Sequence, residues 1–312
     1  MVELKDRILE FHPDTLETVR KDINLDKPGR VDEALDILEE WIKKQDHFLK
    51  KDFSRRYLET TLVTAKGLVE RAKQKIDKLC TFKTLMPEFY DVTISKETFS
   101  TIKSIISHAH LPKMTKGHNR VYIMRFNSDN LDSEVVLTYY RYLLVVCEYL
   151  KLHDYNTGFS IILDYRNANI LNFITKISPL ELRKIVSLMT EGYGMRIKRI
   201  DIISGSKMVD TLVVFFKQIL SAKLGSRIYL HRNLDTIYEA VGKDIMPADY
   251  GGKEKCLEEV NEQWLDVLCS KDNIEFFQEM NKAKTDESCR QGEKFTENYI
   301  GMPGSFRALS VD

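Results

Sequence analysis

Residues 197–221 read IKRIDIISGSKMVDTLVVFFKQILS, a short β-branched run followed by a segment with two faces. The run from Ile197 to Ile203 has the composition and length of a strand. At 100° per residue, segment 206–221 forms an amphipathic helix, and Val214 lies mid-way across its polar side. The apolar face of this helix holds Met208, Val209, Leu212, Val213, Phe215, Phe216, Ile219 and Leu220.

Strand-like runs recur on both sides of this segment. Val121–Phe126, Phe159–Leu163 and Arg227–Leu230 are short, apolar and rich in β-branched or aromatic residues, and helix-length segments separate them. The helix expected over 132–152 is largely buried, because Glu134, Arg141 and Glu148 recur every seventh position and form one narrow stripe among apolar residues. This alternation predicts an α/β fold with a mainly parallel sheet and crossover helices.

The first 90 residues have only helical patterns. We expect a short helix after Pro13-Asp14, a second over 31–42, a third capped by Ser54 and a fourth that ends before Pro87. The predicted organisation is a small all-α N-terminal domain over 1–95, an α/β domain over 96–255, and C-terminal helices and a tail over 256–312. From about residue 281 the chain turns polar and is expected to contribute little to the core.

Composition narrows the class of protein. The 312 residues carry 47 Lys+Arg and 47 Asp+Glu, so the basic excess of a general nucleic-acid binder is absent. No apolar stretch approaches the ~20 residues of a membrane span, and the charged start Met1–Arg7 does not resemble a secretion signal. The five cysteines are odd in number and form no CxxC, as expected of reduced thiols in a cytoplasmic protein.

Signatures of catalysis or cofactor binding are missing from the sequence. It contains no nucleophile elbow, phosphate loop, dinucleotide fingerprint or zinc-protease motif, so we expect neither an enzyme nor a cofactor. His108, His110 and His118 lack neighbouring Cys or carboxylate ligands, and a solvated loop is favoured over a metal site. The apolar strands and helices fit a hydrophobic binding cavity and an ordinary packed core equally well.

Four basic residues form a candidate anion site. Arg196 and Lys198 are two apart on a predicted strand, and Lys223 and Arg227 are four apart in a predicted helix, so each pair shares a face. If the two faces converge, the cluster would bind phosphates. The spacing of these charges, taken alone, favours ordinary solvated surface side chains over a phosphate-binding cluster.

An ordered series of motifs resembles the CRAL-TRIO lipid-transfer family, in the branch that binds tocopherol and retinaldehyde. The matching pieces are Ile161–Asp164, Ser178-Pro179, Tyr193–Lys198, Ile202-Ile203, Phe216–Leu224, Arg227–His231 and Ile245–Gly252. Upstream, Glu70–Lys73 and Met86–Tyr90 are similar to the helical domain that precedes this fold, and Gly304–Asp312 is similar to the tail of arthropod members.

The resemblance implies a lipid cage with a sheet floor and a mobile gate helix over 206–220. By the resemblance, the ligand pocket comprises Phe159, Ile161, Leu163, Leu188, Met189 and Ile200, together with Leu212, Phe215, Phe216 and Ile219 of the gate helix. The family's phosphoinositide-binding residues fall on Arg196, Lys198, Lys223 and Arg227, which then favours a functional role for these four cations.

The function expected from this resemblance is that of a cytoplasmic carrier. It would bind one tocopherol, retinoid, carotenoid or similar isoprenoid, and exchange it at phosphoinositide-containing membranes that it contacts reversibly. A lipid-gated regulatory module, a phosphatidylinositol transfer protein and an enzyme acting on a lipid are the alternatives. We expect no nucleic-acid partner, and the sequence specifies no protein partner.

Overall fold

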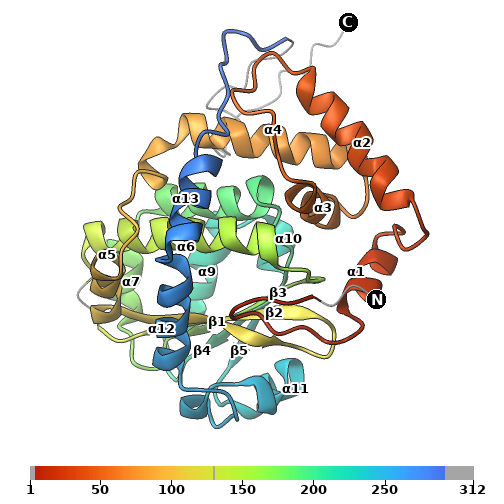
Figure 1. The fold of residues 1–312 in the computed structure, drawn as a ribbon. Coiled ribbons are helices and arrows are strands. Elements are labelled where there is room, and N and C mark those ends of the chain that lie inside the picture. The colour runs from red at the N-terminus through yellow and green to blue at the C-terminus, as the bar shows by residue number, and fades with distance from the viewer. Residues whose placement is uncertain (1–3, 129–130, 292–312) are drawn as a thin grey trace, which may run out of the picture.

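The computed structural model describes residues 4–128 and 131–291, which form a helical N-terminal part and an α/β part (Figure 1). The helices are α1 Thr15–Asp22, α2 Arg30–Lys43, α3 Arg55–Thr64, α4 Val69–Leu85, α5 Lys96–Ser100, α6 Ser133–His153, α7 Ile170–Lys176, α8 Pro179–Ser187, α9 Val209–Ile219, α10 Ala222–Gly225, α11 Asp235–Val241, α12 Leu257–Leu268 and α13 Lys271–Met280. The strands are β1 Ile106–Met114, β2 Asn119–Phe126, β3 Gly158–Asp164, β4 Ile197–Ile203 and β5 Ile228–His231.

Local sequence explains where several helices begin. The Ser54 hydroxyl accepts a hydrogen bond from the Tyr57 amide and caps α3, as the sequence predicts. Ser178 caps α8 in the same way, and Pro179 occupies the first helical position, where its missing N–H costs nothing. The four N-terminal helices expected from the pattern are therefore confirmed, with α4 ending two residues before Pro87.

The five strands follow one another across the sheet in chain order. β1 and β2 are antiparallel, and β2, β3, β4 and β5 are parallel. Because parallel crossovers are right-handed, a sheet built in chain order receives all its crossover helices on one face. In Figure 1, α6 and α9 lie on one side of the sheet and α11 on the other, so the α/β class is confirmed.

The strand β1 is absent from the sequence prediction, and its discovery corrects the interpretation of the histidines. His108 and His110 are each 3% exposed within β1, and His118 is 7% exposed in the turn that follows, so a solvated loop is wrong. Helix α12 covers this edge strand, because Asn261 donates to the His108 carbonyl and Trp264 donates to the His110 carbonyl. These two bonds satisfy carbonyls that an open edge would expose to water.

The segment that follows α13 contributes one hydrophobic residue, Ala283, to the core, in keeping with the expectation. It is nevertheless anchored to the helical part, where Thr285 pairs with Phe48 in an antiparallel bridge. The Arg290 side chain is buried and binds Asp77 at 2.8 Å. Residues 292–312, with the predicted Gly304–Asp312 similarity, lie outside the described residues.

None of the helices in the described ranges combines the length and the apolar character that crossing a bilayer requires.

Candidate functional site

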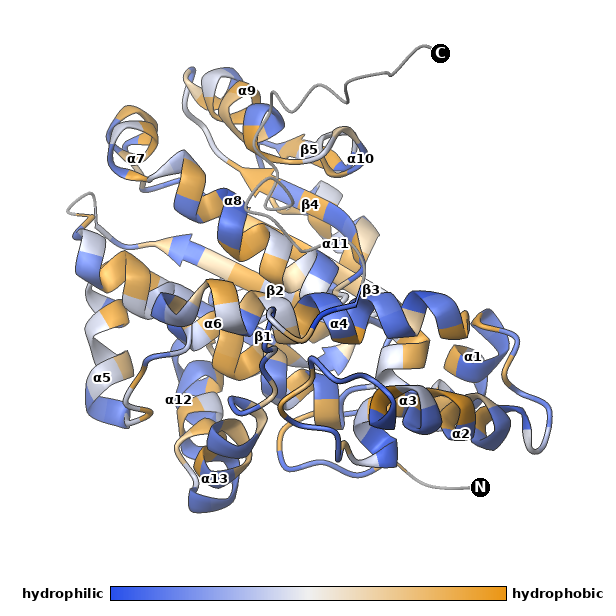
Figure 2. Cartoon of the chain, turned by 90° about the horizontal axis from the view of Figure 1, so that it is seen from above, coloured by the Kyte–Doolittle hydropathy of each residue, from blue (hydrophilic) through white to orange (hydrophobic). Residues whose placement is uncertain are grey.

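A cavity of about 160 Å³ lies between the sheet and the helices packed on its crossover face. Strand alternation supplies its floor, because Phe159, Ile161 and Leu163 point into it while Ile162 between them is fully buried on the other face. The neighbouring strand β2 contributes Tyr122, Met124 and Phe126 by the same alternation. Most of β2 is hydrophobic where it passes beneath the helices (Figure 2).

An irregularity in β4 brings two more isoleucines to the cavity. Phe159 pairs with Ile197 but Ser160 pairs with Arg199, so β4 carries one extra residue at this point. Such a bulge shifts the alternation by one residue. Ile197 and Ile200, three apart in the sequence, therefore both line the cavity.

Helix α9 and the residue that follows it close one side of the cavity. Phe216 and Leu220 line it. On the opposite face of this helix the Val214 side chain is 54% exposed, where the helical phase predicts a polar face. In Figure 2, α9 shows both hydrophobic and hydrophilic residues around its circumference.

The structure brings six of the predicted pocket residues to the cavity wall: Phe159, Ile161, Leu163, Met189, Ile200 and Phe216. Leu188, Leu212, Phe215 and Ile219 are buried but do not line it. Phe215 instead contacts the Phe173 ring of α7, and Phe216 and Leu220 take the positions at the wall. The sequence prediction does not include His110, Tyr122, Tyr139, Tyr165 and Met195, which line the cavity from β1, β2, α6 and the loops flanking β3 and β4.

The cavity wall carries few polar groups, and none of its described residues is Asp, Glu, Lys or Arg. The hydroxyls of Tyr122 and Tyr139 lie 2.5 Å apart and bond to each other, and Thr190 donates to the Val186 carbonyl. Burial lowers the pKa of His110 to about 3, so its imidazole is neutral at pH 7. The site therefore suits an uncharged guest.

A buried polar cluster connects the cavity to the helical part. The Glu148 carboxylate of α6 binds Lys83 of α4 at 2.8 Å, and it accepts bonds from the hydroxyls of Tyr57 and Tyr193. Tyr193 directly follows the π-helical turn Leu188–Gly192, whose Met189 lines the cavity. We call Tyr57, Lys83, Glu148 and Tyr193 the Glu148 cluster.

The turn after Tyr193 requires a glycine. Gly194 has a φ of +77°, and a Cβ there would lie 2.6 Å from the Thr64 hydroxyl of α3. Only a residue without a side chain allows this turn to approach the helical part so closely.

Three of the four predicted phosphoinositide-binding residues lie near one another. The charges of Arg196 and Arg227 both act on Lys198, whose pKa is lowered by partial burial and by these neighbours. Lys66, which the prediction does not include, adds to this effect from the loop after α3. Arg196 also binds Asp22 at 3.1 Å and the Thr157 carbonyl at 3.0 Å.

The fourth residue, Lys223, is exposed on α10. The predicted helical relation between Lys223 and Arg227 is wrong, because α10 ends at Gly225. Arg227 precedes β5, and its guanidinium donates to the Ile197 carbonyl. The two cations therefore do not share one helix face.

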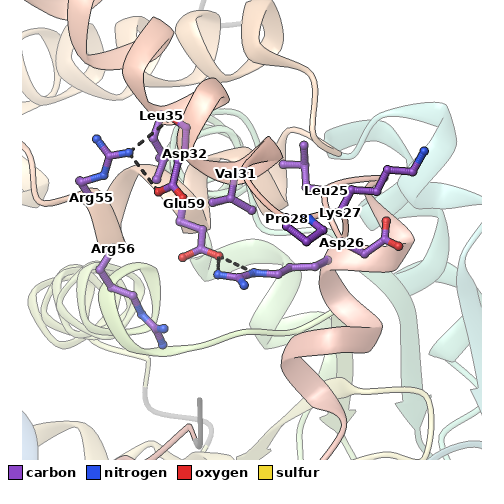
Figure 3. A pocket seen from close by; sticks show the side chains of 12 residues that line it. Leu25, Asp26, Lys27, Pro28, Val31, Asp32, Leu35, Arg55, Arg56 and Glu59 are labelled. Atoms are coloured by element: carbon purple, nitrogen blue, oxygen red, sulfur yellow. Dashed lines mark hydrogen bonds and ion pairs between the residues drawn. The ribbon is translucent and has the colours of Figure 1, made fainter. Parts of the chain in front are cut away.

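A second hollow, of about 320 Å³, lies in the helical part between α1, α2 and α3 (Figure 3). Two ion pairs lie within its wall: Arg20 binds Glu59 at 2.6 Å, and Arg55 binds Asp32 at 3.3 Å (Figure 3). A third arginine of the wall, Arg56, donates to the Leu152 and His153 carbonyls, so the arginines of this hollow already have partners within the protein.

Comparison with known proteins finds similarity over the part of the chain that forms the cavity. Residues 107–252 match the family described as "CRAL/TRIO domain". The alpha-tocopherol transfer protein-like proteins of Mus musculus and Homo sapiens are 25% and 24% identical over 96 residues, which are 30% of this chain and 28% of each relative. The solved structure of Sfh5 has a similar fold, with a TM-score of 0.51 and 12% identity over 87% of this chain and 99% of that one.

Proposed function

Because residues 107–252 match the CRAL/TRIO domain family, we propose that the protein binds one hydrophobic small molecule in the cavity and transfers it between membranes. The observation that carries the proposal is the cavity itself, which is enclosed by strands and helices and has no charged side chain among its described lining residues. Burial of apolar surface supplies the affinity of such a site. A tocopherol, retinoid, carotenoid or similar isoprenoid is the proposed cargo.

Entry of the cargo requires α9 to move. The cavity of about 160 Å³ is smaller than the ~300–1,000 Å³ of typical ligand pockets, and Phe216 and Leu220 restrict it. Helix α9 contacts α7 and α8, and each of the three exposes one large apolar residue: Leu171 on α7, Leu180 on α8 and Val214 on α9. We propose that these residues enter the membrane interface when α9 swings outward.

Basic side chains support the choice of an anionic membrane. Arg196, Lys198 and Arg227 lie near one another, with Lys66 adjacent, and we propose that they hold a phosphoinositide headgroup while the cargo is exchanged. Lys223 is proposed to join them from α10. Since Arg196 already binds Asp22, the headgroup phosphate would compete with that carboxylate.

A transfer assay between vesicles tests this function. Retinol or α-tocopherol is placed in donor vesicles, and its arrival in acceptor vesicles with and without phosphatidylinositol bisphosphate is followed by fluorescence. The account predicts that the full chain accelerates transfer with no other protein present, and more strongly to the phosphoinositide acceptors. The Leu163→Trp variant is the control, because the larger side chain fills the cavity and should abolish transfer.

Two results would contradict the proposal. Transfer at the spontaneous rate with wild-type protein would exclude a carrier. Tight retinol or tocopherol binding without any transfer would instead support the lipid-gated regulatory module.

A further inference from the structure

A small hollow lies at the junction of the helical part and the α/β part. Its volume is about 40 Å³, and it adjoins the apolar cavity, since Phe159 and Met195 line both spaces. One ordered water needs only ~10–15 Å³, so the hollow has room for a small ion. Its polar lining residues are Thr60, Thr64, Lys151, Asp154, Asn156 and Arg196.

The side chain of Lys151 brings a positive charge to this hollow without a matching negative one. Lys151 is 5% exposed, and its ammonium donates to the Thr61 hydroxyl at 2.8 Å. The ammonium also lies 4.9 Å from the centre of the Tyr57 ring. Its other two N–H donors bind no carboxylate in the described part of the chain.

The nearest carboxylates are bound to other cations. Glu148 binds Lys83 at 2.8 Å, and Asp154 binds Arg120 at 2.8 Å. Each of these pairs is neutral, so the charge of Lys151 is left over. A buried charge without a counter-charge is costly, and it is relieved either by a bound anion or by loss of the proton.

Two further cations add to the positive charge at this junction. Arg196 lines the hollow, and Lys75 of α4 is half-buried and forms no ion pair with the described residues. The Lys75 ammonium and the Thr64 hydroxyl lie 2.9 Å and 2.6 Å from the point that a Cβ on Gly194 would occupy. Burial lowers the pKa of Lys75 to about 8, and the Arg196 charge adds to this effect.

The protonation of Lys151 responds to the same surroundings. Burial, followed by the charge of Lys75, lowers the pKa of Lys151 to about 7, so its ammonium is complete only at lower pH. An anion bound beside it would raise this pKa. The titratable groups that face it are Tyr57 of α3, Lys75, Cys80 and Lys83 of α4, and Glu148 of α6, with Asp154, Tyr193 and Arg196 along the hollow.

We propose that this hollow binds one small inorganic anion, of the size of chloride or nitrate, between Lys151 and Arg196. The anion supplies the negative charge that Glu148 and Asp154 give to other cations, and it stabilises the contact of α3 with α6. The inference does not depend on the carrier function, because no cargo enters the hollow.

Thermal unfolding of the full chain provides the test. Sodium chloride and sodium bromide are compared with sodium gluconate, whose anion is too large for the hollow, at equal ionic strength and pH 6. A ligand that binds only the folded state raises the melting temperature, so both halides should raise it by at least about 2 °C relative to gluconate. At pH 9, where Lys151 is neutral, the difference should shrink.

Lys151→Met should abolish the difference between halide and gluconate, and it should fold because it removes a buried charge that has no carboxylate partner. Lys50→Met is the matched control. Lys50 is 7% exposed but binds Asp52 at 2.9 Å and Glu279 at 2.8 Å, so it needs no anion. This variant should keep the halide effect, and general effects of salt on stability cancel in the comparison.

A crystal soaked in sodium bromide locates the ion directly. Anomalous scattering should show bromide beside Lys151 in the wild type and none there in Lys151→Met. An empty hollow, or a halide effect of equal size in wild type and Lys151→Met, would overturn the proposal. Stabilisation by inositol trisphosphate but by neither halide would also overturn it, because the cations would then bind a lipid headgroup rather than a free ion.

Discussion

Replacement of Lys83 by methionine should destabilise the protein strongly, because it leaves a buried charge without its partner. The Lys83 and Glu148 side chains are each 1% exposed and bind at 2.8 Å, and Lys83 also donates to the Met280 carbonyl at 2.8 Å. In Lys83→Met the Glu148 carboxylate keeps only the hydroxyls of Tyr57 and Tyr193 as donors. Breaking a buried pair from one side costs about 3–5 kcal/mol in the free energy of unfolding.

The measurement is equilibrium unfolding in urea, followed by circular dichroism. Lys44→Met is the matched control, since Lys44 binds Glu40 at 2.5 Å but both side chains are 69% exposed, and this change should alter the free energy of unfolding far less. A double variant, Lys83→Met with Glu148→Gln, removes the buried charge and should recover much of the loss. A cost of Lys83→Met no larger than that of Lys44→Met would refute the assignment of the Glu148 cluster as a desolvated junction between the helical part and the cavity.

Three further perturbations test the site. Burial lowers the pKa of His108 and of His110 to about 3 from an ordinary 6.5, so between these values the unfolded chain binds more protons and stability falls as pH falls. At pH 5 the loss in the free energy of unfolding is about 2 kcal/mol for each histidine. In the His108→Phe, His110→Phe double variant stability should therefore depend less steeply on pH, whereas an unchanged dependence would mean that these rings ionise freely. Val214→Asp should slow transfer to vesicles but leave ligand affinity in detergent unchanged, because Val214 is exposed outside the cavity; an equal loss of both would place this residue in the core. Reversal of Lys223 and Arg227 to Glu should weaken binding to phosphoinositide vesicles by several kcal/mol, since each charge near the surface contributes about 1 kcal/mol. The effect should shrink at high salt, which screens the attraction. If the double variant transfers ligand at the wild-type rate at low salt, the two cations have no role at the membrane.

The sequence predicts the strands whose neighbours are buried on both faces. Phe159–Leu163 is almost continuously apolar because both faces of this parallel strand are covered, and Ile197–Ile203 has four isoleucines among its seven residues, so both runs are recognisable without an alignment. Strand β1 escapes prediction because His108, His110 and Pro112 interrupt its apolar character. Its burial depends on Asn261 and Trp264, about 150 residues further along the chain.

The sequence also predicts part of the candidate site, namely the residues whose positions follow from a single strand or helix. The family resemblance implies Phe159, Ile161 and Leu163, and alternation on β3 explains why these three side chains share the cavity face. Helical phase predicts the exposed position of Val214. The bulge after Ile197 is a property of strand pairing that no single strand reveals. In the same way, His110 and Tyr122 meet at the cavity wall only when β1 and β2 pair.

The attachment of segment 281–291 to the helical part depends on distant partners. Arg290 binds Asp77 on α4, more than 200 residues earlier, and local composition contains no signal of that contact.

The most direct test of the central claim is to identify what the cavity holds in the protein purified from its native source. Organic extraction followed by mass spectrometry should recover one tocopherol, retinoid, carotenoid or similar isoprenoid per protein from the wild type. The Leu163→Trp variant, purified in the same way and shown to be folded by its melting temperature, should yield none. Recovery of a phospholipid or a fatty acid, or of the same lipid in equal amount from both proteins, would contradict the account.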